Sequence, residues 1–235
     1  MGQQEIADKL ALGVRELSHD GKIMSADVTL INQLAASLHS RYPLPVVAAS
    51  DGLTLRGAIE LADHESIVLE YYLDNAKPPV GTWGIGVTAA SGHNVLQYKD
   101  RPSTIETVLD VYVDLLRKTY IPAVLRAFKG TPLTEAQFTA ALSFHYNTGA
   151  IGRTDWVDLF LARRLTESRA FLESHYLNGG ALKARRKAEA ALFFGNQWMS
   201  DGKVTVYPVN KPSYTPAFSK GYLVDIRADM AKALA

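Results

Sequence analysis

The sequence predicts an α+β fold, in which a small antiparallel sheet comes first and a mainly helical lobe follows. Two β-favouring stretches, Leu69–Leu73 and Thr82–Thr88, enclose a turn-rich loop and are typical of a pair of strands. From about residue 103 onward, apolar residues recur at the spacing of helices. Strands followed by a run of helices indicate an α+β protein rather than an alternating α/β fold.

The composition excludes several classes of protein. The 235 residues are 47% hydrophobic and 21% charged, as in globular rather than disordered chains. The chain has no cysteine, which excludes disulfides, thiolate metal sites and a cysteine nucleophile. A formal net charge of +1 lacks the basic excess that is typical of nucleic-acid-binding proteins. No apolar stretch of about 18 residues predicts a membrane span, and the first residues do not have the pattern of a signal peptide.

Charge is distributed unevenly along the chain. Residues 1–80 contain 6 Lys and Arg against 11 Asp and Glu, whereas residues 81–235 contain 19 against 13. This difference has two interpretations, which the sequence leaves open. It reflects variation among solvated faces, or it places a basic lobe opposite an acidic one with an anionic substrate between them.

Residues 1–45 predict an N-terminal helical hairpin extension. Apolar residues at spacings of 3 and 4 predict one helix over residues 3–18, and Ser25 is a candidate N-cap for a second. His19–Lys22 is expected to form the turn between them. Arg41–Pro45 contains two prolines and is expected to be a linker to the next domain.

The second predicted domain, residues 46–195, begins with a helix that leads into the pair of strands. Thr54 is a candidate N-cap, and the helix is expected to end between Glu65 and Leu69. The connection between the strands, Asp74–Gly81, is rich in turn-forming residues.

Helices are expected over most of the remaining chain. The pair Thr134 and Gln137 is a capping box for the helix Phe138–Tyr146. The other helices are expected at 104–118, 122–128, 154–163, 166–175 and 182–194. The last segment, 196–235, predicts a strand at Val204–Tyr207 and a closing helix at 222–234, and we expect this extension to pack on the preceding domain.

Three side chains around the predicted hairpin form a candidate catalytic group. Glu65 ends a helix, Asp74 follows nine residues later in the loop, and Thr82 opens the returning strand. Glycosidases need one carboxyl group that protonates the leaving oxygen and a second that stabilises positive charge or directs a water. By composition alone, Asp63 and Glu70 are equally good candidates, and acids at helix ends are commonly plain surface residues.

Three motifs, in order along the chain, resemble the phage-type lysozymes of glycoside hydrolase family 24. The first is Glu65 with Asp74 nine positions later and the glycine-containing strand Thr82–Thr88. The second is Ser143–Gly149, which resembles the family's Ser-Phe-x-Phe-Asn-x-Gly helix end. The third is Gly180–Phe193, which resembles its Gly-Leu-x-x-Arg-Arg-x-Ala-Glu-x-x-Leu-Phe helix. The resemblance covers residues 55–195, about 60% of the chain.

The resemblance implies a two-lobed lysozyme-like fold and a role for each matching residue. Glu65 would be the general acid that protonates the glycosidic oxygen. Asp74 would orient the attacking water and stabilise the oxocarbenium-like transition state, and Thr82 would hold that water. Family members of this type favour an inverting displacement, in which a water lies between the two carboxyl groups.

The resemblance also implies contacts from the helical lobe. Arg185 aligns best with the family arginine that pairs with the catalytic glutamate, although Arg186 could be shifted into that role. Asn147 would hydrogen-bond the substrate across the cleft. The helix at about 104–118 would join the two lobes.

The function that the resemblance implies is hydrolysis of the β-1,4 bond between N-acetylmuramic acid and N-acetylglucosamine in bacterial peptidoglycan. The protein would be a phage or prophage endolysin that acts as a monomer, without cofactor or metal. It would accumulate in the host cytoplasm and reach the wall in the periplasm by holin-dependent release or on a virion. Two alternatives remain open: a lytic transglycosylase, and a non-catalytic peptidoglycan-binding virion protein.

The sequence departs from the family pattern at several positions. The loop between Asp74 and Thr82 is two residues longer, with Lys77-Pro78-Pro79 inserted. Ser66 replaces the glycine that usually follows the catalytic glutamate, and Val87 stands where histidine is common.

Other conspicuous side chains have simpler interpretations. Trp83, Tyr72 and Trp156 are expected in the core. His145 is expected to be an interior histidine with its hydrogen bonds satisfied, and His64 lies beside Glu65 in the sequence but is expected to point away from it. None of the six histidines forms a His-x-x-x-His pair, so no metal site is predicted.

Overall fold

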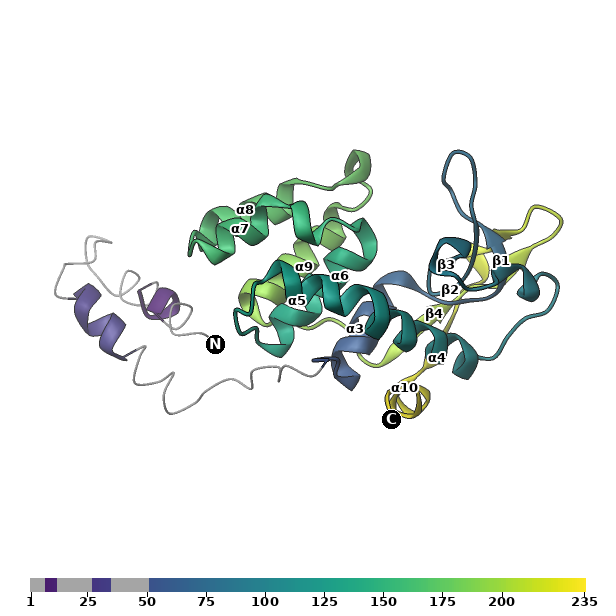
Figure 1. Ribbon diagram of the computed structural model, residues 1–235, viewed down its shortest axis with the longest axis horizontal. Helices are drawn as coiled ribbons and strands as arrows, with labels where there is room; N and C mark the ends of the chain where they lie inside the picture. The colour runs from purple at the N-terminus through teal and green to yellow at the C-terminus, as the bar shows by residue number, and fades with distance from the viewer. Residues whose placement is uncertain (1–6, 12–26, 35–50) are drawn as a thin grey trace. The chain divides into compact units, whose positions relative to one another are not determined.

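The computed structural model describes residues 7–11, 27–34 and 51–235 (Figure 1). The chain divides into two compact units, Met1–Val47 and Ala48–Ala235. In the first unit, residues 7–11 and 27–34 are helical, within the two expected helices. The rest of those helices, the turn His19–Lys22 and the linker Arg41–Pro45 lie outside the described residues.

The second unit begins with helix α3 (Leu55–Glu65), which is capped as the sequence predicts. The hydroxyl oxygen of Thr54 accepts a hydrogen bond from the backbone N–H of Gly57 at 3.0 Å. The same hydroxyl donates to Glu135 Oε1 at 2.6 Å, which ties the start of α3 to the start of a later helix. The predicted start and end of this helix are confirmed.

A three-stranded antiparallel sheet follows α3, in the order β1-β2-β3. Its strands are β1 (Val68–Leu73), β2 (Gly81–Gly84) and β3 (Val87–Thr88). Thr82 lies opposite Tyr72 on β1, so the two side chains share one face of the sheet. The prediction of a hairpin at this place is confirmed.

The single strand expected over Thr82–Thr88 is wrong, because the chain reverses within it. Gly84 and Gly86 have φ angles of 65° and 68°, in the left-handed region that glycine enters without steric cost. At Gly84 a Cβ atom would also lie 3.3 Å from Val108 Cγ1. The two glycines therefore form a tight turn between β2 and β3 instead of lying within one strand.

Ser66 occupies a backbone conformation that is essentially reserved for glycine. Its φ and ψ are 63° and 174°, and such strain costs roughly 1–3 kcal/mol in a residue that has a Cβ atom. We expect Ser66→Gly to stabilise the protein by about 1 kcal/mol, because the relief of strain outweighs the extra freedom of glycine in the unfolded chain. Thermal unfolding should show a rise in Tm of about 2–4 °C. Ser66→Ala keeps the Cβ atom and serves as the control; an equal rise with alanine would contradict the explanation.

The helix that joins the lobes continues past its predicted end at residue 118. Helix α4 (Ile105–Leu115) runs into a π-helical segment (Leu116–Tyr120) and then into α5 (Ile121–Ala127). Pro122 has no backbone N–H, so it cannot extend the regular α-helical hydrogen-bond ladder. The wider π turn before it keeps the helix continuous, whereas the sequence interpretation placed two separate helices here.

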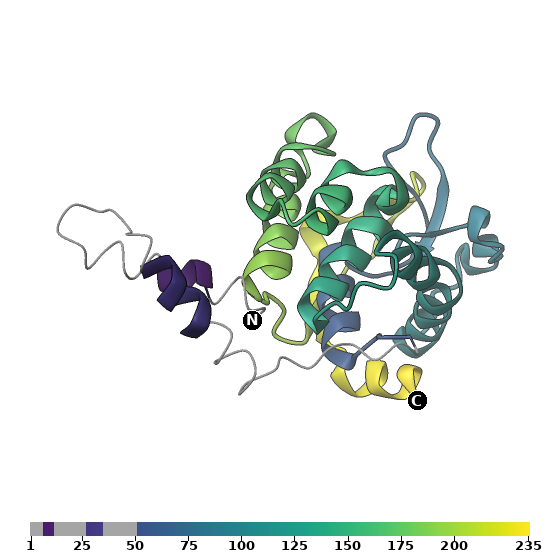
Figure 2. The ribbon, with the colours of Figure 1, turned by 60° about the vertical axis from the view of Figure 1, so that its left-hand side comes forward.

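The helical lobe consists of four further helices in the predicted places. Helix α6 (Glu135–Thr148) begins with the complete capping box of Thr134 and Gln137. The following helices are α7 (Asp155–Leu161), α8 (Leu165–Ser174) and α9 (Lys183–Gly195). Figures 1 and 2 show these helices gathered on one side of the unit and the β1–β2–β3 sheet on the other.

Aromatic side chains fill the cores of both lobes, as expected for the tryptophans. Trp156 is fully buried, and its ring packs edge-on against Phe144 and Phe193. Trp83 is also fully buried, stacks on Tyr98 with ring centroids 3.9 Å apart, and donates through Nε1 to the carbonyl oxygen of Leu69 at 3.1 Å. These contacts fix the framework from which the polar side chains project.

The C-terminal segment contains a second small sheet, which corrects one prediction. Strand β4 (Lys203–Val206) pairs antiparallel with β7 (Tyr222–Asp225), and helix α10 (Arg227–Leu234) follows. The helix expected over 222–234 is therefore wrong for its first four residues. Pairing with β4, a contact distant in sequence, determines their extended conformation.

The C-terminal segment packs on α3, on α4 and on the first sheet. Helix α10 contacts α3 and α4, and Figures 1 and 2 show it beside them. Strand β4 makes a parallel bridge between Val206 and Ile67, the residue before β1. The hairpin of β5 (Val209–Asn210) and β6 (Thr215–Pro216) contacts β1 as well.

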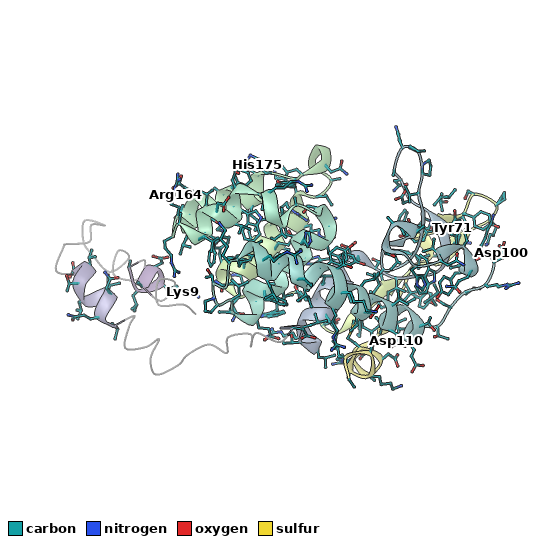
Figure 3. All side chains as sticks on the ribbon, viewed as in Figure 1. Lys9, Tyr71, Asp100, Asp110, Arg164 and His175 are labelled. Carbon is teal, nitrogen blue, oxygen red and sulfur yellow. The ribbon has the colours of Figure 1, made fainter. Side chains whose placement is uncertain are left out.

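Polar contacts fix this hairpin at the sheet end of the molecule. Tyr214 donates a hydrogen bond to Asp100 Oδ2 at 2.8 Å, and Lys211 forms ion pairs with Glu70 and Asp100. Figure 3 shows Asp100 and Tyr71 at this end. Short 3₁₀ helices complete the fold at Ala89–Ser91, Val95–Tyr98, Ile151–Arg153, Asn178–Gly180 and Phe218–Lys220. No helix within the described ranges is long and apolar enough to cross a membrane.

Candidate active site

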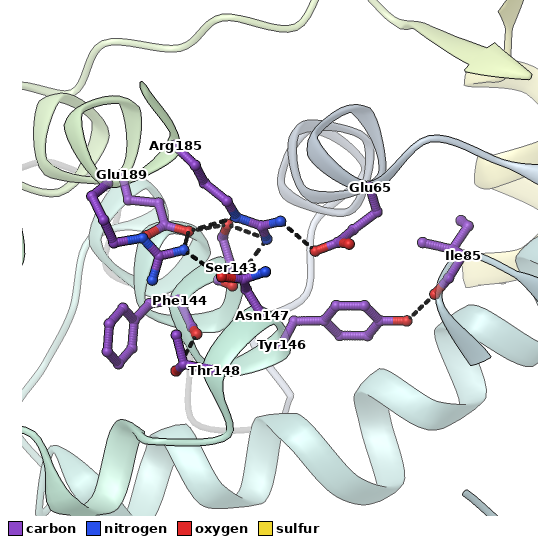
Figure 4. Close-up of polar contacts among 10 residues, drawn as sticks. Glu65, Ile85, Ser143, Phe144, Tyr146, Asn147, Thr148, Arg185 and Glu189 are labelled. Atoms are coloured by element: carbon purple, nitrogen blue, oxygen red, sulfur yellow. Dashed lines mark hydrogen bonds and ion pairs between the residues drawn. The ribbon is translucent and has the colours of Figure 1, made fainter. Parts of the chain in front are cut away.

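Glu65, at the last position of α3, faces the helical lobe and pairs with Arg185 of α9. Arg185 Nη1 lies 2.6 Å from Glu65 Oε1, and the two side chains are only 10% and 17% exposed. Figure 4 shows the two groups meeting between their helices. Arg185, which aligned better than Arg186 in the sequence, is the arginine that the structure places against Glu65.

A buried carboxylate holds Arg185 in this position. Glu189, one turn further along α9, accepts a hydrogen bond from Arg185 Nε at 3.1 Å and another from the Ser143 hydroxyl at 2.8 Å. Arg185 Nη2 also donates to the Ser143 carbonyl oxygen at 3.2 Å. Burial raises the pKa of Glu189, whereas the neighbouring arginines and Ser143 lower it. The sequence interpretation gave Glu189 no role, although it lies four residues after Arg185, on the same helix face.

Arg186, the next residue on α9, hydrogen-bonds one side of the Asn147 amide. Its Nη2 donates to Glu189 Oε1 at 3.0 Å and to Asn147 Oδ1 at 2.9 Å, and the Arg186 side chain is fully buried. The carbonyl oxygen of the Asn147 amide is therefore occupied. Its amide nitrogen remains as the group that could donate to a ligand.

Asp74, directly after β1, closes the long loop of the hairpin. Its Oδ1 accepts hydrogen bonds from the backbone N–H groups of Ala76 at 3.0 Å and Val80 at 2.8 Å. Its own N–H donates to the carbonyl oxygen of Val80 at 3.1 Å. In the described part of the chain, Oδ2 has no hydrogen-bond partner. The lengthened loop thus fixes the orientation of the carboxylate and leaves one oxygen for another group.

Thr82, on β2, is 97% buried and lies directly opposite Tyr72 of β1. Its hydroxyl donates to the carbonyl oxygen of Val80 at 3.1 Å, so only its acceptor capacity remains. Burial raises the pKa of Tyr72, and the carboxylates of Glu65 and Asp74 raise it further. Tyr72 is therefore close enough to both acids to interact with their charges. The sequence interpretation treated this residue as core only.

The tyrosine at the end of α6 connects the two lobes beside Glu65. The Tyr146 hydroxyl donates to the carbonyl oxygen of Ile85, in the turn between β2 and β3 (Figure 4). Its ring contacts those of Tyr120 and Tyr112, with centroids 4.5 and 5.8 Å away. Burial raises the pKa of all three tyrosines, and the charge of Glu65 adds to the effect.

The two acids occupy different surroundings. Glu65 lies among tyrosines and an arginine in a mostly buried position, whereas Asp74 lies at the edge of an exposed loop. The two carboxyl groups therefore differ in solvent exposure and in their polar partners. No cluster of three His, Asp or Glu residues suitable for a metal ion occurs among the residues that the structure describes.

His64 is half-buried near the arginines, and its surroundings predict a loss of stability in acid. Burial, with Arg185 and Arg186 nearby, lowers its pKa from 6.5 to about 4. Between these pH values His64 is protonated in the unfolded chain but not in the folded chain. The free energy of unfolding therefore decreases as the pH falls. The loss should reach about 3 kcal/mol near pH 4. Urea unfolding at pH 7 and pH 4.5 should show a smaller decrease for His64→Gln than for the parent; equal decreases would contradict this.

Comparison with known proteins gives a family match for this part of the chain. A family model described as phage lysozyme matches residues 62–189, more than half of the sequence. A search of curated proteins found no match.

Two solved structures are similar to the chain. The endolysin from Escherichia coli O157:H7 phage FAHEc1 is 20% identical, with a TM-score of 0.46 over 63% of this chain and 98% of that one. The muramidase domain of SpmX from Asticaccaulis excentricus is 25% identical, with a TM-score of 0.43 over 58% of this chain and 93% of that one.

Proposed function

Because this chain belongs to the phage lysozyme family, it is a peptidoglycan-cleaving glycoside hydrolase with a lysozyme-like α+β fold, and we propose that it is an N-acetylmuramidase. The bond hydrolysed is the β-1,4 link from N-acetylmuramic acid to N-acetylglucosamine. The observation that carries this proposal is the pairing of Glu65 with Arg185, close to Tyr72 on the hairpin that carries Asp74 and Thr82.

In the proposed reaction, Glu65 is the general acid and Asp74 directs the water. Glu65 gives its proton to the glycosidic oxygen as the bond to the anomeric carbon breaks. A water oriented by Asp74 and by the acceptor oxygen of Thr82 attacks that carbon from the other face, and the proton of the water passes to Asp74. The result is inversion at the anomeric carbon. Arg185 fixes the position of Glu65, and the amide nitrogen of Asn147 donates to the substrate.

We propose a biological role that follows from the family. The protein acts as a monomeric phage or prophage endolysin, accumulates in the host cytoplasm, and reaches the cell wall in the periplasm through a separate holin. The domains would be residues 1–45, 46–195 and 196–235. Of these, the last supports the catalytic part through α10 and β4.

The test is the chemistry of the products released from purified sacculi. The protein should release fragments with reducing N-acetylmuramic acid ends, identified by mass spectrometry. Anhydro ends would identify a lytic transglycosylase instead, because that reaction uses an internal hydroxyl group and no water. Binding to sacculi without any release would identify a non-catalytic wall-binding protein. Inverted anomeric configuration in the first products, read by NMR, would support the proposed single displacement.

A further inference from the structure

A cavity of about 610 Å³ lies in the helical lobe, on a different face of α6 from Glu65. It is lined by residues of α5, α6 and α7 and of the Ile151–Arg153 turn. Ser143 and Asn147 of α6 face the arginines of α9, whereas His145 faces the cavity and contacts Tyr120, with ring centroids 5.5 Å apart. The proposed catalytic residues take no part in it.

The rim of the cavity is positively charged. Arg126, Lys129 and Arg153 line it and are exposed, and the acid among its lining residues is Asp158. Asp158 lies 3.8 Å from Lys129 Nζ. Arg153 Nη1 donates only to a backbone carbonyl oxygen, at 3.2 Å. Two guanidinium groups are therefore left without a carboxylate in the described part of the chain, which favours an anionic ligand.

Two buried polar atoms at the cavity also lack partners among the described residues. Thr154 is 98% buried at the N-terminus of α7, yet its hydroxyl makes no capping hydrogen bond. His145 Nδ1 is buried without a hydrogen bond, so the expectation that this histidine is satisfied was wrong. Burial lowers the pKa of His145, and Arg153 and Arg126 lower it further. Buried polar groups normally have partners, and a ligand would supply them here.

Part of the cavity lining is apolar. Ala123, Ala127, Ile151 and Val157 line it together with the charged residues. A site of this volume holds more than a simple ion. The pattern suits a chain end that carries a carboxylate next to short apolar side chains.

We propose that this cavity binds the carboxylate end of a short alanine-containing peptide, of the kind that peptidoglycan carries on its glycan strands. The carboxylate lies between Arg126 and Arg153, the hydroxyl of Thr154 and Nδ1 of His145 bond the last peptide group, and the methyl groups contact the apolar part of the lining. The assignment of the peptide to the cell wall rests on the proposed function. The recognition of the carboxylate does not.

The first experiment measures binding of N-acetyl-D-alanyl-D-alanine to the full chain by calorimetry and NMR in low salt. This probe has no glycosidic bond, so the result is independent of catalysis. We expect binding, and affinity about 10-fold lower for the C-terminal amide of the same peptide, which lacks the charge. No binding, equal binding of the amide, or displacement of the peptide by an equal concentration of inorganic phosphate would overturn the proposal.

Substitutions of residues that line the cavity test whether the peptide binds there. Arg126→Gln and Arg153→Gln should each weaken peptide binding about 10-fold, whereas Arg101→Gln, which removes an exposed arginine elsewhere, should change it less than about twofold. Thr154→Val should raise Tm, because an unpartnered hydroxyl is removed, and should still weaken binding. Equal effects of Arg101→Gln and Arg153→Gln, or unchanged binding by Thr154→Val, would overturn the assignment.

A comparison of two substrates, with and without peptide, tests the peptide site separately from the proposed muramidase activity. Arg153→Gln should hydrolyse glycan strands that have been stripped of peptide at the parent rate, and should clear intact sacculi more slowly. Absence of all hydrolysis by the parent would contradict the muramidase proposal and leave the peptide-binding result valid. Equal clearing of intact sacculi by Arg153→Gln and the parent would overturn the role of the cavity in wall binding.

Discussion

Replacement of Glu65 by glutamine is expected to lower the rate of peptidoglycan hydrolysis by about 10²–10⁴-fold, the usual contribution of a general acid. Glutamine has nearly the same shape and cannot donate the proton that the leaving oxygen needs. The Glu65 side chain is only 17% exposed, and among the described residues its ion-pair partner is Arg185. The fold depends little on this contact, because Arg185 keeps its bonds to Glu189 and Ser143. Turbidity clearing of sacculi measures the rate, and circular dichroism measures the fold.

Two neighbouring acids provide matched controls for Glu65→Gln. Asp63 lies on the same helix, and Glu70 lies on β1 and pairs with Lys211. Composition alone made both of them candidates. Asp63→Asn and Glu70→Gln should each retain activity within a few-fold of the parent. Full activity of Glu65→Gln, or inactivation by either control, would mean that the general acid is a different residue.

Replacement of Glu189 by glutamine is expected to destabilise the protein by about 3–5 kcal/mol. The Glu189 side chain is fully buried and accepts hydrogen bonds from Arg185, Arg186 and Ser143. Glutamine keeps the shape and removes the negative charge, so Arg186 would remain buried without a carboxylate. The Tm should fall by about 10 °C, and hydrolysis should fall as well, because Arg185 loses the group that orients it against Glu65.

Two further variants test whether the unpaired charge of Arg186 causes the loss of stability in Glu189→Gln. Glu173 pairs with Arg169 four residues earlier, as Glu189 does with Arg185, but on an exposed helix surface. Glu173→Gln should therefore cost less than about 1 kcal/mol. Combining Arg186→Met with Glu189→Leu removes both charges and should destabilise less than Glu189→Gln alone. A double variant that is less stable than Glu189→Gln would show that packing, and not charge, is the main contribution.

Local signals predicted much of the fold. Thr54 and Thr134 carry their capping information within four residues of themselves, and both helices begin as expected. The predictions of secondary structure failed where strand pairing between distant residues, or a local backbone conformation, determines the structure. Residues 222–225 form a strand because β4 pairs with them, and the turn at Gly84 and Gly86 depends on backbone angles that a pattern of small and bulky residues does not encode.

The candidate site was predictable as a set of residues but not as a set of contacts. Motif spacing selected Glu65, Asp74 and Arg185, and the structure pairs Glu65 with Arg185. Alignment favoured Arg185 but did not exclude Arg186, because the contact with Glu65 depends on how α9 is rotated against α3. The roles of Glu189 and Tyr72 also depend on tertiary packing, since one is buried between helices and the other is brought near both acids by strand register.

The bonds at both ends of β1 have a consequence for protein synthesis. Ile67, two residues after Glu65, exchanges backbone hydrogen bonds with Thr205 and Tyr207, and the N–H of Leu73, just before Asp74, donates to Tyr214. A ribosome that has reached residue 195 has already made every proposed catalytic side chain, but not the segment that completes the strand between the two acids. Because domains fold as units, the nascent hydrolase acquires its finished catalytic strand only when the last part of the chain has emerged.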